Sequence, residues 1–129
     1  MKKLALIALP IAALAIPASA HHSPASYDTT KRVQIQGAVQ TAFFRNPHGH
    51  IDVQVKDARG KVQTWKVETS AANLLRRRGW VFSKVKPGVT GTFIGHPNKT
   101  VPNDIYLREI VFSDGTRFGD KGGNDNVLD

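Results

Sequence analysis

The sequence predicts a small, mainly β domain, and three observations support this fold class. The chain has 129 residues, which suits one domain. After residue 20, Val, Ile, Phe, Trp and Tyr outnumber Ala and Leu by 27 to 10, a bias typical of pleated, half-buried strands. Several short segments also alternate apolar with polar residues, as a strand with one buried face does. We therefore expect strands to dominate.

The first 20 residues predict a secretory signal peptide. Lys2 and Lys3 give a basic start, residues 4–16 form an apolar run, and residues 18–20 read Ala-Ser-Ala, an A-x-A cleavage site. The run is shorter than the ~20 residues that span a bilayer. We expect a periplasmic or secreted protein that begins at His21 and is not an integral membrane protein after cleavage.

Sulfur chemistry is excluded from the exported chain. The sequence has no Cys, and its single Met is Met1. Disulfides, lipid-anchored Cys, iron–sulfur clusters and thiolate or thioether metal sites are therefore ruled out. Any metal would have to be held by nitrogen and oxygen ligands.

The first expected strand covers residues 33–39, where apolar and polar side chains alternate. Gly37 inside it predicts a bulge or a sharp bend of the kind that curls a sheet into a barrel. Residues 41–44 extend the strand, and Arg45-Asn46-Pro47 breaks it.

The next two strands can be aligned by the turn between them. A three-residue loop over 58–60, with Gly60 in the left-handed conformation, would pair Asp57 with Lys61. A loop of two or four residues would instead set apolar against polar side chains. The register then pairs Val53 with Trp65, Ile51 with Val67, Asp52 with Lys66, His50 with Glu68, and His48 with Ser70.

A short helix is expected over residues 70–79, with Thr69 or Ser70 as its N-cap and Gly79 just past its end. A strand over 89–94 follows the turn at residues 86–88, and a turn over 95–98 that contains His96 ends it.

The last long strand is expected over residues 105–112. The parity of its apolar residues changes between Leu107 and Ile110, which predicts a bulge near residues 108–109. Asp114-Gly115 predicts a tight turn after it.

The element order is strand, strand, strand, helix, strand, strand, which is the order of the five-stranded oligonucleotide/oligosaccharide-binding (OB) barrel. A β-sandwich is the alternative, and the single helix at this place together with Gly37 favours the barrel. We expect a signal peptide over 1–20, an N-terminal arm over 21–31, an OB-like β domain over 32–118 and a disordered tail over 119–129.

Four of the five histidines form two groups, His21-His22 and His48-Gly49-His50. Cleavage after Ala20 would give His21 a free α-amine beside its imidazole, and these two nitrogens can chelate one metal ion. A third imidazole would complete the arrangement called a histidine brace, which suits Cu(II). His22 is the second choice for a ligand.

His48 and His50 are two residues apart, so an extended strand places both on one face. Glu68 lies across from His50 in the expected register and would ligate the metal or accept a ring N–H. Imidazole, amine and carboxylate suit Cu(II), Zn(II) or Ni(II), and Cu(II) binds such a set most strongly. The alternative is an ordinary cross-strand pair and a solvated arm.

The basic charge of the chain favours a different class of function. Lys and Arg total 18 against 10 Asp and Glu, a net charge of +8. A metal-free interaction module would use such a surface to hold a protein or an anionic envelope component, such as a glycan or a lipid headgroup. Arg76-Arg77-Arg78 is the main basic cluster, although basic residues at a helix end also stabilise the helix itself.

Neither nucleic-acid binding nor catalysis is favoured. Export argues against nucleic acid, and Trp65 and Trp80 are expected to pack inside rather than stack on bases. No nucleophile, base and acid set is visible, and the acidic residues are scattered. We expect a binding protein, with an oxidative copper enzyme left open.

Short motifs occur along the exported part of the sequence. They are His21-His22-Ser23, Tyr27-Asp28, Gly37-Ala38-Val39, Asn46-Pro47-His48, Trp65-Lys66-Val67-Glu68, Leu74-Leu75, Arg78-Gly79-Trp80, Pro87-Gly88 and Gly95-His96-Pro97. With these motifs the sequence resembles a family of small exported proteobacterial proteins known as domain of unknown function 6152. The resemblance covers nearly the whole exported chain and implies a periplasmic β domain, and it brings no established activity or ligand. Phe43-Phe44-Arg45 stands where the family pattern has a Trp before Asn-Pro-His.

Overall fold

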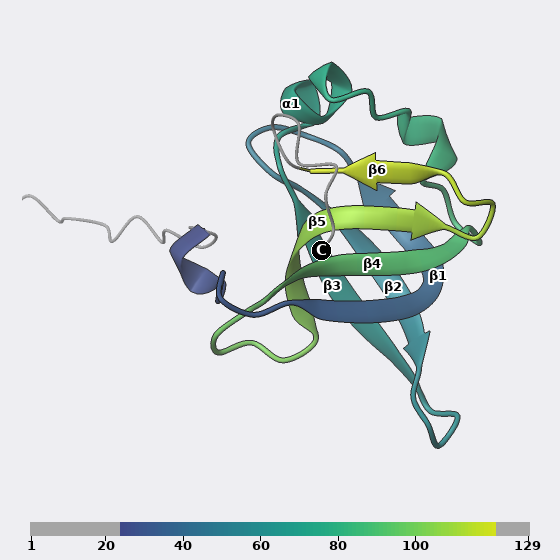
Figure 1. The fold of residues 1–129 in the computed structure, drawn as a ribbon. Helices are drawn as coiled ribbons and strands as arrows, with labels where there is room; N and C mark the ends of the chain where they lie inside the picture. Colours follow the sequence, from purple (N-terminus) through teal and green to yellow (C-terminus); the bar gives the residue numbers. More distant parts are fainter. Residues whose placement is uncertain (1–23, 121–129) are drawn as a thin grey trace, which may run out of the picture.

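The structure, a computed structural model, describes residues 24–120 as a small β-barrel with one extra strand and a short helix (Figure 1). The signal peptide expected over 1–20, His21, His22 and residues 121–129 of the expected tail lie outside the described residues. The elements are the 3-10 turn η1 (Pro24–Ser26), β1 (Val33–Phe43), β2 (Gly49–Lys56), β3 (Val62–Thr69), α1 (Ala72–Arg77), η2 (Phe82–Lys84), β4 (Thr90–Pro97), β5 (Asp104–Phe112) and β6 (Arg117–Gly119).

The strand order confirms the predicted OB-like barrel. Neighbouring strands pair in the order β3, β2, β1, β4, β5, β6, and β3 also pairs with β5. The β3–β5 pairing is parallel, whereas the others are antiparallel. It closes five strands into a barrel, with β6 added at the edge of β5. The helix lies between β3 and β4, as the sequence predicts.

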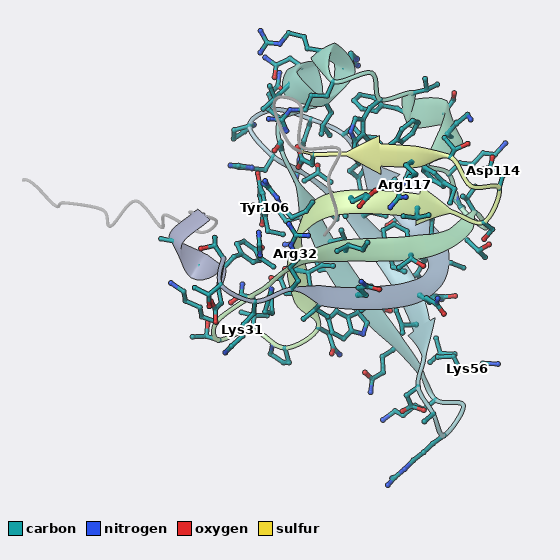
Figure 2. All side chains as sticks on the ribbon, viewed as in Figure 1. Lys31, Arg32, Lys56, Tyr106, Asp114 and Arg117 are labelled. Atoms are coloured by element: carbon teal, nitrogen blue, oxygen red, sulfur yellow. The ribbon has the colours of Figure 1, made fainter. Side chains whose placement is uncertain are left out.

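The β2–β3 hairpin has the predicted register. Its ladder pairs His50 with Glu68, and its loop joins Asp57 N–H to the Lys61 carbonyl at 2.9 Å. Gly60 has a φ of 81°, the left-handed conformation that this loop requires. The hairpin projects beyond the barrel, with Lys56 near its end (Figure 2). The ladder ends at Gly49, so His48 lies one residue outside the strand.

The bend predicted in β1 is present, but the bulge lies three residues further along. The β1–β2 register shifts between Val39 and Thr41, which makes Gln40 the extra residue. Gly37 serves a different purpose, because a Cβ there would lie 2.2 Å from the Gln54 carbonyl oxygen. The glycine permits a close backbone approach where the sheet curls.

The bulge predicted in β5 is confirmed at Arg108. In the β4–β5 ladder Ile94 pairs with Glu109 and Gly95 pairs with Leu107, so Arg108 is the unpaired residue. The turn expected over 95–98 is wrong, since β4 continues to Pro97 and His96 pairs with Tyr106. A Cβ on Gly95 would lie 2.3 Å from the Tyr106 carbonyl oxygen, so this glycine keeps two strands close instead of turning the chain.

The helix begins later than predicted. Its N-cap is Ala71, whose side chain makes no capping hydrogen bond, and Asn46 Oδ1 accepts the Asn73 backbone N–H in the first turn at 3.2 Å. Thr69 and Ser70, the expected caps, are buried, and their hydroxyl groups bind elsewhere: Thr69 Oγ1 to the Ser70 carbonyl oxygen and Ser70 Oγ to the Tyr106 hydroxyl. Gly79 follows the helix with a φ of 87°, as the sequence predicts.

The core fills the barrel and continues under the helix. It consists of the inward-facing apolar side chains of the strands, together with apolar side chains of α1 and of the segment that follows α1. Trp80 packs there on Phe118, and its indole N–H donates to the Gly119 carbonyl at 2.8 Å. The buried cluster consists of Ile35, Val39, Ile51, Val53, Val67, Leu75, Trp80, Val85, Phe93, Ile105, Leu107, Ile110, Phe112 and Phe118.

Two buried residues lie outside the predicted 32–118 domain. Tyr27 in the expected arm is 3% exposed, and Asp120 past the predicted end is 1% exposed. Tyr27 bridges to Asn98 and thereby ties the arm to the end of β4. Among the described residues, no helix is long and apolar enough to cross a membrane.

Adding a methyl group at Gly37 tests the close strand approach. We expect Gly37→Ala to lower the free energy of unfolding by about 1–3 kcal/mol, because its Cβ would meet backbone that cannot move aside. Gly119→Ala is the matched control, since a Cβ there meets nothing within 4 Å. Urea unfolding of both variants measures the difference, and equal losses would contradict the role assigned to Gly37.

Candidate functional site

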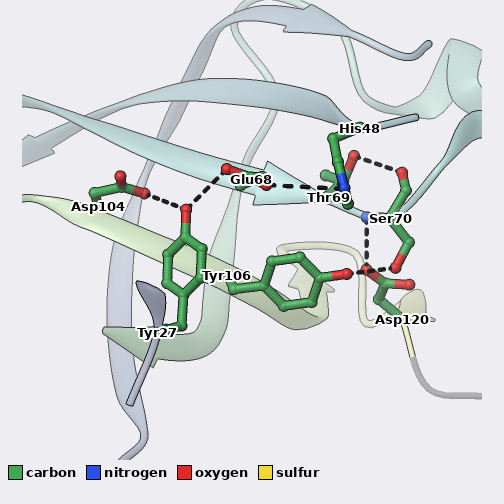
Figure 3. A network of polar contacts seen from close by, with 8 residues as sticks. All are labelled: Tyr27, His48, Glu68, Thr69, Ser70, Asp104, Tyr106 and Asp120. Carbon is green, nitrogen blue, oxygen red and sulfur yellow. Dashed lines mark hydrogen bonds and ion pairs between the residues drawn. The ribbon is translucent and has the colours of Figure 1, made fainter. Parts of the chain in front are cut away.

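The described residues with the most concentrated polar chemistry surround Glu68 near the end of β3. We call Tyr27, His48, Glu68 and Asp104 the Glu68 cluster (Figure 3). The parallel β3–β5 pairing sets Lys66 opposite Asp104 and Glu68 opposite Tyr106, and so brings two acidic residues of distant sequence together. Glu68 is 3% exposed and Asp104 is 6% exposed. Buried carboxyl groups such as these two require hydrogen-bond donors.

Tyr27 donates to this pair of carboxyl groups. Its hydroxyl oxygen lies 2.9 Å from Glu68 Oε2 and 3.1 Å from Asp104 Oδ1. A phenol has one proton and serves one of the two acceptors at a time. Burial and then the hydrogen bond to Glu68 raise the pKa of Tyr27, so its hydroxyl stays protonated. The arm is therefore held to the barrel wall by a permanent donor.

The carboxyl group of Asp104 is buried, which disfavours its charged form. Burial raises its pKa above the ordinary value, although hydrogen bonds from Tyr27 and Asn98 act in the opposite direction. Asn98 Nδ2 donates to Asp104 Oδ2 at 3.2 Å. The negative charge of Glu68 also raises the pKa of Asp104, because two carboxylates repel each other. Asp104 thus holds a proton at higher pH than a solvated aspartate does.

His48 approaches Glu68 from the side opposite to the arm. Its Nδ1 lies 3.3 Å from the Thr69 carbonyl oxygen and 3.8 Å from Glu68 Oε1. A carbonyl oxygen can only accept, so Nδ1 carries the proton in the neutral ring. Nε2 then has a lone pair, and it makes no hydrogen bond to the described residues. The side chain is 32% exposed, so part of the ring is accessible to solvent.

His50 and His48 both line one small cavity, but different contacts hold the two rings. His50 pairs with Glu68 across the β2–β3 ladder, and its ring lies 5.1 Å from that of Phe43, centre to centre. The cavity measures about 60 Å³ and is lined by Arg45, His48, Gly49, His50, Lys66 and Glu68. The sequence thus correctly groups His48, His50 and Glu68.

The described residues alone do not assemble a metal site. Among residues 24–120, no group of three or more His, Asp or Glu side chains is placed to hold a metal ion. Two further predicted ligands, His21 and His22, precede that range. Arg45 and Lys66 also line the cavity and oppose a cation, whereas Glu68 favours one.

A second polar cluster lies beside the first, around Asp120. Its carboxylate accepts the Ser70 backbone N–H at 3.0 Å and forms an ion pair with Arg78. Ser70 Oγ and the Tyr106 hydroxyl are 2.8 Å apart. Burial raises the pKa of Asp120, although Ser70 and Arg78 act in the opposite direction. This cluster fastens the end of β6 to the start of the helix.

Sequence reasoning missed Tyr27, Asp104, Tyr106 and Asp120. Tyr27 was visible only as part of a polar arm, and Asp104 only as the residue before a strand. Their functional setting depends on the β3–β5 pairing, which joins strands without a shared turn. The one local signal was the pair Tyr27-Asp28 in an otherwise small and polar segment.

A comparison with known families finds one match. A model described as a family of unknown function (DUF6152) matches residues 8–104, well over half of the chain. The match includes His48 and Glu68 and ends at Asp104. No curated protein and no solved structure matches the chain.

The raised pKa of Asp104 predicts the direction in which the stability of the protein changes with pH. A carboxyl group whose pKa is higher in the folded than in the unfolded chain stabilises the fold below its ordinary pKa, and this contribution is lost as the pH rises through the folded value. We expect Asp104→Asn to lose less stability than the unchanged protein as the pH rises from about 4 towards neutrality.

Urea unfolding at several pH values measures this slope. Asp114→Asn is the control, because hydrogen bonds from Thr116 lower the pKa of the exposed Asp114 and give its contribution the opposite sign. Equal pH slopes for Asp104→Asn and the unchanged protein would show that Asp104 is not the buried, proton-holding group described here.

Proposed function

This chain belongs to the family of unknown function DUF6152, and we propose that it is an exported protein that binds Cu(II) through its mature N-terminus and His48. Zn(II) is the weaker competitor for the same ligands. The role is binding, not catalysis. The observation that carries the proposal is the imidazole of His48, whose Nδ1 faces the Thr69 carbonyl and Glu68, while Nε2 makes no hydrogen bond to the described residues.

This arrangement of His48 is the one that metal-ligating histidines usually have. In such sites the ring nitrogen that does not bind the metal donates to a carbonyl or a carboxylate, which fixes the tautomer and the orientation of the ring. His48 has both kinds of acceptor at Nδ1, namely Thr69 O at 3.3 Å and Glu68 Oε1 at 3.8 Å. Glu68 is therefore assigned the supporting role and His48 the ligand role.

The anchored arm supports the second half of the site. Tyr27 binds one oxygen of Glu68 while His48 faces the other oxygen of the same carboxylate. His21 lies six residues before Tyr27, and a fully extended chain of that length spans roughly 20 Å. The mature N-terminus is therefore tethered within reach of His48. Export and cleavage after Ala20 are premises of this proposal.

The proposed ligands suit Cu(II). The His21 amine, the His21 imidazole and His48 Nε2 would give three nitrogen ligands, and Cu(II) binds such sets more tightly than Zn(II) does. All three are neutral when bound, so the carboxylate of Glu68 would supply a negative charge beside the metal. Arg45 and Lys66 at the cavity rim disfavour a weakly held cation, which makes strong nitrogen ligation a requirement.

The N-terminus can be tested without altering the barrel. We expect the protein that begins at His21 to bind Cu(II) at least tenfold more tightly than the same protein with one additional Ala before His21, because an added residue removes the amine from the chelate. Competition with a chelator measures the affinity, and the nitrogen splitting in the electron paramagnetic resonance spectrum counts the ligands. Equal affinities would contradict the proposal.

His48 and His50 form a matched pair for the second test. His48→Gln is expected to weaken Cu(II) binding by about tenfold or more, and His50→Gln to change it far less, since only His48 has its Nδ1 held by Thr69 and Glu68. The reverse ranking would move the ligand role to His50. Unchanged Cu(II) binding in both variants would remove both histidines from the site and contradict the proposal. A protein that binds no Cu(II) at all would favour a metal-free interaction module that holds a protein or an anionic envelope component.

A further inference from the structure

A second, larger cavity lies on another side of Tyr27 and is independent of the proposed Cu(II) site. It measures about 370 Å³ and is lined by Tyr27, Thr29, His96, Tyr106 and Arg108. These residues come from the arm, β4 and β5, and only Tyr27 also belongs to the Glu68 cluster. Pockets that hold small organic ligands have volumes from about 300 Å³ upwards. The cavity is therefore large enough for a small molecule.

Arg108 brings an incompletely paired positive charge to this cavity. It is the extra residue of the β5 bulge, and bulges redirect side chains, often next to binding sites. Its Nε is buried and has no hydrogen-bond partner. Among residues 24–120, no carboxylate forms an ion pair with it. The carboxylate of Asp120 pairs with Ser70 and Arg78, and Arg108 acts on it only through its charge, which lowers the pKa of Asp120.

The other walls offer apolar faces and one hydrogen-bond acceptor. The rings of Tyr27 and Tyr106 lie 5.4 Å apart, tilted against each other (Figure 3). His96 Nδ1 lies 2.7 Å from the Lys31 carbonyl oxygen, so Nδ1 donates and Nε2 of the neutral ring is an acceptor. The cavity thus combines one guanidinium, two aromatic rings and one acceptor nitrogen.

We propose that this cavity binds a small organic acid. The carboxylate would form a two-point pair with the terminal guanidinium nitrogens of Arg108, the geometry that arginine favours for carboxylates. The body of the ligand would lie against the tyrosine rings, and a hydroxyl group on it would donate to His96 Nε2. A single guanidinium balances a singly charged carboxylate better than a doubly charged phosphate.

Two probes of one shape test the charge requirement in the unaltered protein. 4-Hydroxybenzoate has a carboxylate, a ring and a hydroxyl donor, and 4-hydroxybenzamide differs in having a neutral amide. We titrate each into metal-free protein that begins at His21 and record amide shifts by NMR. We expect saturable shifts at Thr29, Tyr106 and Arg108 with the acid, and at least tenfold weaker binding of the amide. Equal binding of both probes, or no saturable shift at these residues, would overturn the proposal.

Two arginine variants then assign the charge to Arg108. Arg108→Gln is expected to weaken 4-hydroxybenzoate binding by about tenfold. Arg117→Gln is the matched control, since Arg117 lies on β6 in an exposed pair with Glu109. This variant is expected to bind the probe as the unchanged protein does. If Arg108→Gln does not fold, Arg108→Lys, which keeps the charge but not the planar fork, is expected to bind several-fold more weakly. Undiminished binding in the folded Arg108 variant would overturn the proposal.

Discussion

The parallel pairing of β3 with β5 is the constraint on which the rest of the molecule depends. It closes the barrel, and at the same ladder it sets Lys66 beside Asp104 and Glu68 beside Tyr106. Glu68 and Asp104 are thereby buried together, where neither could stay without donors. Tyr27 and Asn98 supply donors from outside the two strands, and His48 Nδ1 lies 3.8 Å from Glu68. Closure of the barrel thus fixes the arm and an imidazole as well as the core.

Tyr27 is the residue that both candidate sites share. Its hydroxyl group binds Glu68. The same residue lines the second cavity, together with Arg108. The arm is therefore part of the folded barrel, although it precedes the first long strand. In the functions we propose, one anchored side chain tethers the N-terminus for Cu(II) and shapes a separate pocket for an organic acid.

Much of the fold could be predicted because its information is local. The loop that ends at Gly60 sets the β2–β3 register, and the parity change after Leu107 marks the bulge at Arg108. The site was predictable only within that hairpin, where His50 pairs with Glu68. Asp104 and Tyr27 join it through contacts between distant segments, which no pattern within one segment encodes. Thr69 and Ser70 have the residue types of helix caps, but tertiary hydrogen bonds use their hydroxyl groups instead.

In the proposed Cu(II) site, Thr69 and Glu68 hold the protonated Nδ1 of His48 and leave Nε2 as the ligand atom. Long-range nitrogen–proton NMR of the metal-free protein, at a pH of about 8 where an ordinary imidazole is neutral, reports the tautomer directly. We expect a protonated, pyrrole-type Nδ1 and an unprotonated, pyridine-type Nε2 for His48. A ring protonated at Nε2 would contradict the proposed site.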